Sequence, residues 1–331
     1  MNAALMIEDM LMDLLPHLPI LHARFVYQLL ADARLPRWKG ALLRGGWGRA
    51  LSAVFCYPDC DQPSHCSYAC PYRMLFTPEA PSGHVAGVRD APRPFLVRPP
   101  LTDHTTMHRG EQLVFEVVLI GSAVHYAHVM MAAFAHLGRL GLGVDRSPAT
   151  LIQGFSFSDQ AQQFIPCFHN GQWLPLTQPI QPQFFYDAVD DAGDRWQLQF
   201  VTPTRIKHAG TLRRQFDIPL LVSAAIRRLQ HLNTLYGTMP WQPPVDSLLA
   251  DARAAHVASD RMRWVDWGRT SEATGQTMHL GGMIGTLDVH GMTPALVRLL
   301  TMASTVHIGK AAVFGNGWFR VQPTVAPPRS L

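Results

Sequence analysis

The order of the apolar segments constrains this fold more than any other feature, because the same order occurs twice. The first set reads strand, helix, strand, strand, helix, strand, over residues 23–32, 40–55, 93–100, 111–121, 123–141 and 150–158. The second set repeats that order at 195–206, 219–237, 261–271, 276–291, 293–304 and 306–321, with a loop inside the last segment. This β-α-β-β-α-β order is that of the ferredoxin-like motif.

The repeated order predicts an α+β chain of two tandem ferredoxin-like domains. We place the N-terminal domain at 18–160, with a Cys-rich loop inserted at 56–70, and the C-terminal domain at 195–322. The polar, Pro- and Gln-rich segment 161–194 between them is interpreted as an extra hairpin and linker. A length of 331 residues agrees with two domains, and 47% hydrophobic residues are enough for two cores.

We expect a cytoplasmic location and no membrane association. Glu8, Asp9 and Asp13 stand where a secretory signal would be basic and then apolar. The longest apolar run, 115–138, contains Glu116 and three histidines. It is therefore interpreted as a buried strand followed by a buried helix rather than a membrane span.

Four of the five cysteines lie close together with the spacing C-x3-C-x5-C-x3-C. Four thiols within 15 residues, in a chain without a secretory signal, favour a metal site over disulfides. Zinc is the first choice for four thiolates, while an iron–sulfur cluster, a disulfide or free thiols remain alternatives. The residues are Cys56, Cys60, Cys66 and Cys70, and His65 could replace one of them.

The positive charge comes mostly from arginine, because the chain has 25 arginines and only three lysines. The planar guanidinium group suits phosphate, although a GC-rich genome would also favour arginine codons. Arg44 and Arg49 lie on a helix that contains several glycines, "GALLRGGWGRAL". This pattern could let a nucleic-acid backbone approach while the arginines bind phosphate, or it could be a solvated helix face.

Basic residues also gather in the second half of the chain. Some end the strand "TPTRIKHAG", and others alternate with Trp264 and Trp267 in "RMRWVDWGRTS". Such alternation is typical of sheet surfaces that stack bases and neutralise phosphates, but also of an edge strand with its charges in solvent. The candidate RNA-binding residues here are Arg205, Lys207, His208, Arg263 and Arg269.

Common catalytic motifs are missing from the sequence. It has no G-x-S-x-G, no H-E-x-x-H and no dinucleotide fingerprint after a first strand, and Lys310 lacks the spacing of a phosphate-binding loop. Any single histidine among the sixteen is more often structural than catalytic. The histidines predicted to lie on loops remain candidates for a catalytic base: His65, His84, His104, His108 and His208.

The chain resembles the RAMP superfamily of CRISPR-associated proteins, and within it the repeat-cleaving endoribonucleases that process precursor CRISPR RNA. The segments that carry the resemblance run in order over residues 23–322: "GALLRGGWGRAL", "CPYRMLF", "RPFLVRPP", "VVLIGSA", "HLGRLGLG", "TPTRIK", "WVDWGRTS", "GGMIGTL" and "HIGKAAVFGNGWFRV". The last is the most specific, because a glycine-rich loop after the final helix is the hallmark of the superfamily. The resemblance implies that Gly309, Lys310, Gly315 and Gly317 lie against the repeat RNA.

The resemblance also implies a reaction that needs no metal, in which the ribose 2′-OH attacks the adjacent phosphorus and a 2′,3′-cyclic phosphate forms. Many members place a histidine in or just after the first helix, but helix 40–55 of this chain has none. The implied catalytic residues are His65 as the nearest substitute, and Lys39, Arg44 and Arg49 in a version without histidine. The implied partners are CRISPR repeat RNA and other effector subunits. The alternative is a RAMP subunit that binds guide RNA without cutting it.

Overall fold

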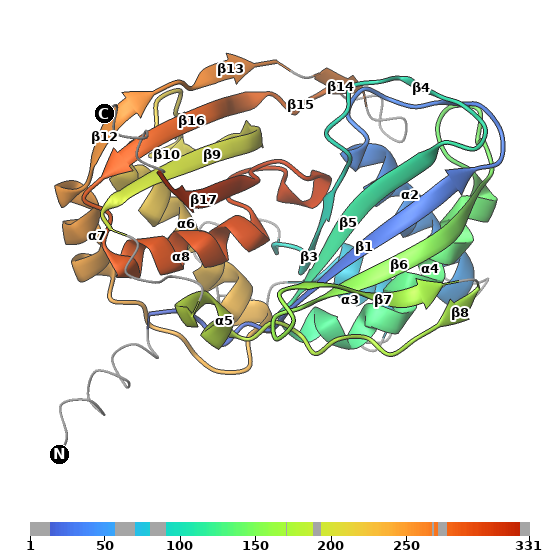
Figure 1. Cartoon of the computed structure of the whole chain (residues 1–331), viewed down its shortest axis with the longest axis horizontal. Helices are drawn as coiled ribbons and strands as arrows, with labels where there is room; N and C mark the ends of the chain where they lie inside the picture. Colours follow the sequence, from blue (N-terminus) through green and yellow to red (C-terminus); the bar gives the residue numbers. More distant parts are fainter. Residues whose placement is uncertain are drawn as a thin grey trace, which may run out of the picture. The chain divides into compact units, whose positions relative to one another are not determined.

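The computed structural model describes residues 14–56, 70–79, 91–169, 171–187, 193–266, 268–270 and 277–324. They form two compact units, which are described separately below (Figure 1). The N-terminal unit contains residues 18–181 and 235–238. The C-terminal unit contains residues 182–234, those from 239 onward and the short segment before residue 18.

The N-terminal unit contains one antiparallel sheet and two main helices. Its elements are β1 (Ile20–Leu29), β2 (Ala33–Arg34), α2 (Gly40–Phe55), α3 (Pro71–Phe76), β3 (Phe95–Arg98), β4 (Thr106–Met107), β5 (Gln112–Ile120), η2 (Gly121–Tyr126), α4 (Ala127–Leu140), β6 (Ala149–Ser158), β7 (Gln163–His169) and β8 (Gln172–Trp173). The strand order is β3-β5-β1-β6-β7-β8. The first four strands have the order of a ferredoxin-like sheet, and the β7–β8 hairpin extends one edge.

Alternation along the strands gives this sheet one apolar face, which α2 and α4 cover (Figure 1). Tyr27 and Phe25 of β1 point to that face, where the Tyr27 hydroxyl donates to the carbonyl of Phe134 in α4. Trp47 of α2 is fully buried. The centre of its ring lies 4.5 Å from that of Phe95 and 5.1 Å from that of Phe134. Each large side chain buried in this way stabilises the fold by roughly 1.5–3 kcal/mol. Among the described residues, the opposite face carries no helix of its own unit.

The C-terminal unit repeats the arrangement. Its elements are α5 (Pro182–Asp187), β9 (Arg195–Thr204), β10 (Lys207–His208), β11 (Thr211–Leu212), α6 (Ile218–Tyr236), α7 (Val245–Ala254), β12 (His256–Asp260), β13 (Arg263–Val265), β14 (Gly268–Thr270), β15 (Thr277–His279), β16 (Gly282–His290), α8 (Pro294–Val306), η3 (Ala312–Phe314) and β17 (Phe319–Pro323). The main sheet has the order β12-β16-β9-β17, and β13 also pairs with β16. Thr293 caps α8 by accepting a hydrogen bond from the amide of Leu296.

The predicted fold class, with two ferredoxin-like halves made of antiparallel sheets, is therefore confirmed. The strand expected at the start of 306–321 is wrong, because residues 307–318 form a folded loop and only Phe319–Pro323 pair with β9. The strand expected at 261–271 is divided into short pieces. No helix in the described ranges is long and apolar enough to cross a membrane.

Candidate functional site

The glycine-rich loop between α8 and β17 is built against the end of β9. Gly309, Gly315 and Gly317 all have positive φ angles, of +84°, +88° and +79°. A Cβ at Gly317 would overlap the carbonyl oxygen of Ile308, and one at Gly309 would overlap that of Arg205. The glycines are therefore needed by the backbone of the loop itself, in addition to any space they leave for RNA.

Buried polar contacts hold this loop in place. The Asn316 side-chain amide donates to the carbonyls of Pro203 (3.1 Å) and Leu280 (2.8 Å). His307 donates through Nδ1 to the carbonyl of Asn316, and Thr202 donates through its hydroxyl to that of Gly315. The Lys310 amide donates to the Arg205 carbonyl. The exposed Lys310 side chain is thus carried by a loop with a defined conformation next to the end of β9.

A group of exposed cations lies on this loop, on the segment that follows β9 and on β13, and we call it the basic surface. Its members have no ion pair with any residue in the described ranges: Lys207, Arg213, Arg214, Arg263 and Lys310. The Arg213 amide bonds the Ile206 carbonyl, and the Arg214 guanidinium lies 4.6 Å from the ring centre of Trp264. The first contact closes the base of the β10–β11 hairpin, and the second joins the segment after it to β13, which also carries Arg263. The Lys310 amide contacts Arg205 just before the same hairpin.

The other predicted RNA-binding residues of this unit have less uniform surroundings. His208 is exposed beside Lys207 in β10. Arg205 is half-buried and has contacts of its own. Arg269 lies in β14 opposite Met278, and its side chain is outside the described part of the structure. Arg205 and His208 therefore lie beside the basic surface, while the position of the Arg269 side chain stays a prediction.

The residues proposed for catalysis around α2 are not gathered in one place. Lys39 precedes the helix and is fully buried, with its ammonium group donating to the carbonyls of His104 (2.7 Å), Thr102 (3.1 Å) and Arg37 (3.4 Å). Burial lowers the pKa of Lys39 from its usual value. Arg44 lies over the ring of Phe76, and Arg49 is exposed. Each of the three side chains thus has a different environment.

The glycines of α2 serve helix packing. A Cβ at Gly46 would lie 2.7 Å from a methyl carbon of Leu137 in α4, and one at Gly48 would lie 2.9 Å from the ring of Phe76 in α3. Gly45, by contrast, leaves room for a Cβ among the described residues. The glycine spacing that suggested a close approach of RNA therefore has a structural cause at Gly46 and Gly48.

The predicted metal ligands lie only partly within the described residues. Cys56 follows α2 and Cys70 precedes α3, and both are half-buried free thiols. Cys60, Cys66, His65 and also His84 lie outside the described ranges. Among the residues that are described, no three His, Cys, Asp or Glu side chains lie close enough to hold a metal ion. The zinc site stays a prediction.

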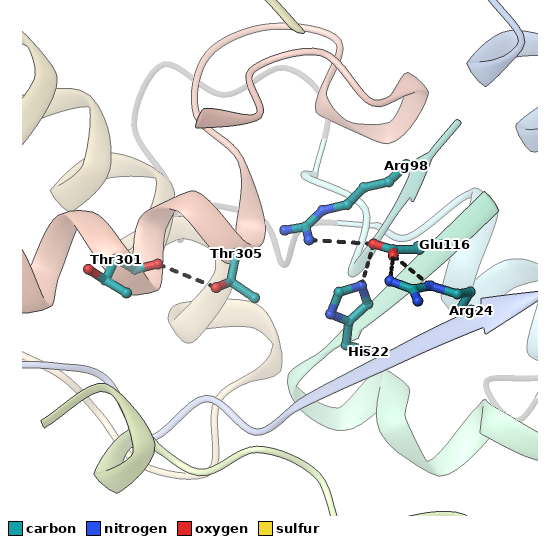
Figure 2. Close-up of polar contacts among 6 residues, drawn as sticks. All are labelled: His22, Arg24, Arg98, Glu116, Thr301 and Thr305. Atoms are coloured by element: carbon teal, nitrogen blue, oxygen red, sulfur yellow. Dashed lines mark hydrogen bonds and ion pairs between the residues drawn. The ribbon is translucent and has the colours of Figure 1, made fainter. Parts of the chain in front are cut away.

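The sequence analysis missed a polar cluster on the N-terminal sheet. Arg24 of β1, Glu116 of β5 and Arg98 of β3 lie directly opposite one another on adjacent strands. They occupy the face away from α2 and α4, since they alternate with residues that pack on the helices. Figure 2 shows His22, Arg24 and Arg98 converging on the carboxylate of Glu116. A signal was present, because three apolar strand segments each contain a charged residue.

The contacts of this cluster are short and largely shielded from solvent. His22 Nε2 lies 2.8 Å from Glu116 Oε2, and Arg24 binds Oε1 through Nε (3.0 Å) and Nη2 (2.7 Å). Arg98 Nη1 lies 3.7 Å from Oε2. The Arg24 guanidinium also lies 3.9 Å from the ring centre of Phe164, and His22 meets the same ring edge-on. Three cationic or polar groups thus contact one carboxylate, and an aromatic ring packs against two of them.

The electrostatics of the cluster follow from burial and neighbouring charge. Burial opposes ionisation of Glu116, but the His22 hydrogen bond and the two arginines outweigh it and lower the Glu116 pKa to about 2. Burial is also the main influence on His22, and with the arginine charges it lowers the His22 pKa despite the nearby carboxylate. At neutral pH the cluster therefore contains an ionised carboxylate and a neutral imidazole.

Two family models match the chain, one in each half. A model described as an N-terminal domain matches residues 18–178, and the model of the CRISPR-associated endoribonuclease Cas6 matches residues 198–319. Residues 198–319 thus form a domain of the Cas6 endoribonuclease family. No curated protein matches the sequence.

Solved structures of Cas6 proteins share this fold at low sequence identity. A Cas6 product complex aligns with a TM-score of 0.57 and 16% identity, covering 92% of this chain and 99% of the other. Thermus thermophilus Cas6 aligns with a TM-score of 0.54 and 15% identity, covering 92% and 98%. A partial Cas6-RT-Cas1–Cas2 complex aligns with a TM-score of 0.61 and 14% identity, covering 96% of this chain and 48% of the other. The chain thus spans about half the length of that larger protein.

Proposed function

We propose that the protein binds CRISPR repeat RNA and cuts it without a catalytic metal, through attack of a ribose 2′-OH on the adjacent phosphorus. The observation that supports this most directly is the basic surface, in which five exposed cations lie on the glycine-rich loop, after β9 and on β13, in the half of the chain that matches the Cas6 model. Phosphate groups of RNA provide the charge that these residues lack. The proposed products are a 2′,3′-cyclic phosphate and a 5′-hydroxyl end, and the protein then stays bound to the product within an effector complex.

The experiment is incubation of the purified protein with repeat RNA in EDTA under single-turnover conditions. We expect cleavage at one position, with a cyclic phosphate on the upstream product. A deoxyribose at the scissile nucleotide should abolish cleavage and leave binding intact, because it removes the nucleophile. RNA that is neither bound nor cut would contradict the proposal.

A second candidate is a RAMP subunit that binds guide RNA without cutting it. It is favoured by the burial of Lys39 and by the lack of a histidine in α2, "GALLRGGWGRALSAVF". The same experiment separates the two candidates, since repeat RNA that is shifted on a gel but remains intact would support this one.

The basic surface predicts a specific salt dependence of RNA binding. Replacing Lys207 and Lys310 by alanine should weaken binding about tenfold at moderate salt. Each lost phosphate contact should reduce the slope of log K against log salt by about 0.7, because fewer counterions are released. Filter binding of labelled repeat RNA at several salt concentrations measures both the affinity and its salt slope.

The matched control is Arg195→Ala. Arg195 is also exposed and begins β9, nine residues before Thr204 and thus about 30 Å along the strand. We expect its salt slope to match that of the wild type. Equal slopes for all three proteins would show that the basic surface does not bind RNA.

A further inference from the structure

The polar cluster of the N-terminal sheet has no part in the RNA binding argued above. Its members come from three adjacent strands, and registration of β1 with β5 and of β3 with β5 places Arg24 and Arg98 on either side of Glu116. Because β1 and β5 are inner strands of this sheet, their backbones are paired on both sides. The side chains are therefore positioned by a rigid scaffold, as a reactive site requires.

The hydrogen bond between His22 and Glu116 determines which ring nitrogen carries the proton. An ionised carboxylate can only accept, so the Nε2 atom of His22 must donate in the 2.8 Å contact. In the neutral ring the Nδ1 atom then carries a lone pair. Within the described ranges no residue bonds to Nδ1, and the His22 side chain is 12% exposed. This is the arrangement of a base that is oriented by a carboxylate.

The arginines give the cluster a net positive charge. Two guanidinium groups contact one carboxylate, so with His22 neutral the formal charge of these four side chains is +1. The Arg24 side chain is 38% exposed, which leaves part of its donor group accessible. Phe157 and Phe164 lie within 6.4 Å and 5.1 Å of the His22 ring, measured between ring centres. Cationic donors, a base and aromatic rings together suit a phosphodiester with an unstacked nucleotide.

We propose that His22 is the general base of RNA cleavage, that Glu116 positions it, and that Arg24 and Arg98 stabilise the charge that develops on the phosphate. This inference rests on the proposed function and names residues for it. His22 Nδ1 accepts the 2′-OH proton while the bond from O2′ to phosphorus forms. The bond from phosphorus to O5′ breaks, and O5′ takes a proton from water. His22 returns its proton to the resulting hydroxide, so the reaction needs no co-reactant beyond water.

The first test compares His22→Ala and His22→Gln with the wild type in single-turnover cleavage of repeat RNA. We expect both variants to cut about 10²–10⁴-fold more slowly, the usual contribution of a general base. Binding of the RNA should stay within threefold of the wild type. The Gln variant retains an amide donor for Glu116, so its melting temperature should stay close to that of the wild type even if the Ala variant folds poorly.

Added imidazole gives a readout that a structural role would not move. It should restore part of the rate in His22→Ala, where a cavity replaces the ring, and none in His22→Gln, where the side chain fills the site. His169→Ala is the matched control, since His169 is an exposed histidine on β7 of the same sheet. It should cut at the wild-type rate.

Glu116→Gln tests the positioning role through the pH profile. The negative charge of Glu116 raises the His22 pKa, whereas Arg24 and Arg98 lower it. Loss of that charge should move the acidic limb of the rate profile to lower pH, and Glu116→Asp should move it back toward the wild type. A limb that stays in place would overturn this role of Glu116.

The outcomes distinguish a failure of this inference from a failure of the proposed function. If the wild type cuts and either His22 variant cuts within threefold of it, the function stands and His22 is not the base. A large loss of rate that imidazole does not restore in the folded Ala variant would assign His22 a structural role and also overturn the inference. A wild type that binds RNA but never cuts it would overturn both.

Discussion

Gly317→Ala should lower the stability of the C-terminal unit by about 3 kcal/mol or more, which corresponds to roughly 10 °C in the melting temperature of a unit of this size. Two effects add at this position. The φ angle of +79° is unfavourable for any residue with a Cβ, and the added methyl group would overlap the Ile308 carbonyl oxygen. The loop must then leave the end of β9, so RNA binding should weaken as well. Thermal melting followed by circular dichroism measures the effect.

Gly210→Ala is the control for this prediction. Gly210 has almost the same φ angle, +78°, but in the β10–β11 turn no atom of the described residues lies within 4 Å of where its Cβ would be. The Gly210→Ala variant should therefore be less stable than the wild type by only about 1 kcal/mol, the cost of the left-handed conformation alone. Equal losses in the two variants would show that the close contact with Ile308 does not matter.

Lys39→Met should destabilise the N-terminal unit by about 3 kcal/mol. Methionine has a similar length but no donor, so the carbonyls of Thr102 and His104 would lose their partner, and hydrogen bonds to a charged donor are worth roughly 1.5–3 kcal/mol each. Part of that loss is offset because a buried charge is removed. We expect faster amide hydrogen exchange around residues 102–108, together with a lower melting temperature.

Arg49→Met is the matched control, because Arg49 is an exposed cation on the same helix. Its effect on stability should stay within about 0.5 kcal/mol. If Lys39→Met melts like the wild type but loses cleavage, the ammonium group acts in the chemistry, and the structural role argued here for Lys39 is wrong.

The local pattern of the sequence was enough to predict the double ferredoxin-like order. Alternation in segments such as "EQLVFEVVLIG" and glycine after helical segments such as "AVHYAHVMMAAFAHLGRLG" are local signals, and each half supplied all six elements in the right order. The glycine-rich loop was also located correctly. Its conformation was not, because no local pattern encodes the positive φ angles at His307 and Ala311, the contact of His307 with Asn316 or that of Asn316 with β9.

The polar cluster could not be predicted for a related reason. His22, Arg98 and Glu116 are far apart in sequence, and only the register of three strands brings them together. Glu116 entered the sequence analysis only as an argument against a membrane span. The burial of Lys39 could not be predicted either, because a lysine before a helix usually lies in solvent, whereas the carbonyls of Thr102 and His104 bind this one.

The fixed shape of the glycine-rich loop also affects how much free energy is available for binding. Asn316, His307 and Thr202 already hold the loop before any RNA arrives. Binding therefore does not have to restrict the backbone carrying Lys310, and little conformational entropy is lost there. A ligand that contacts this loop should bind with a small entropic penalty from the protein, and most of the ordering on association should occur in the RNA.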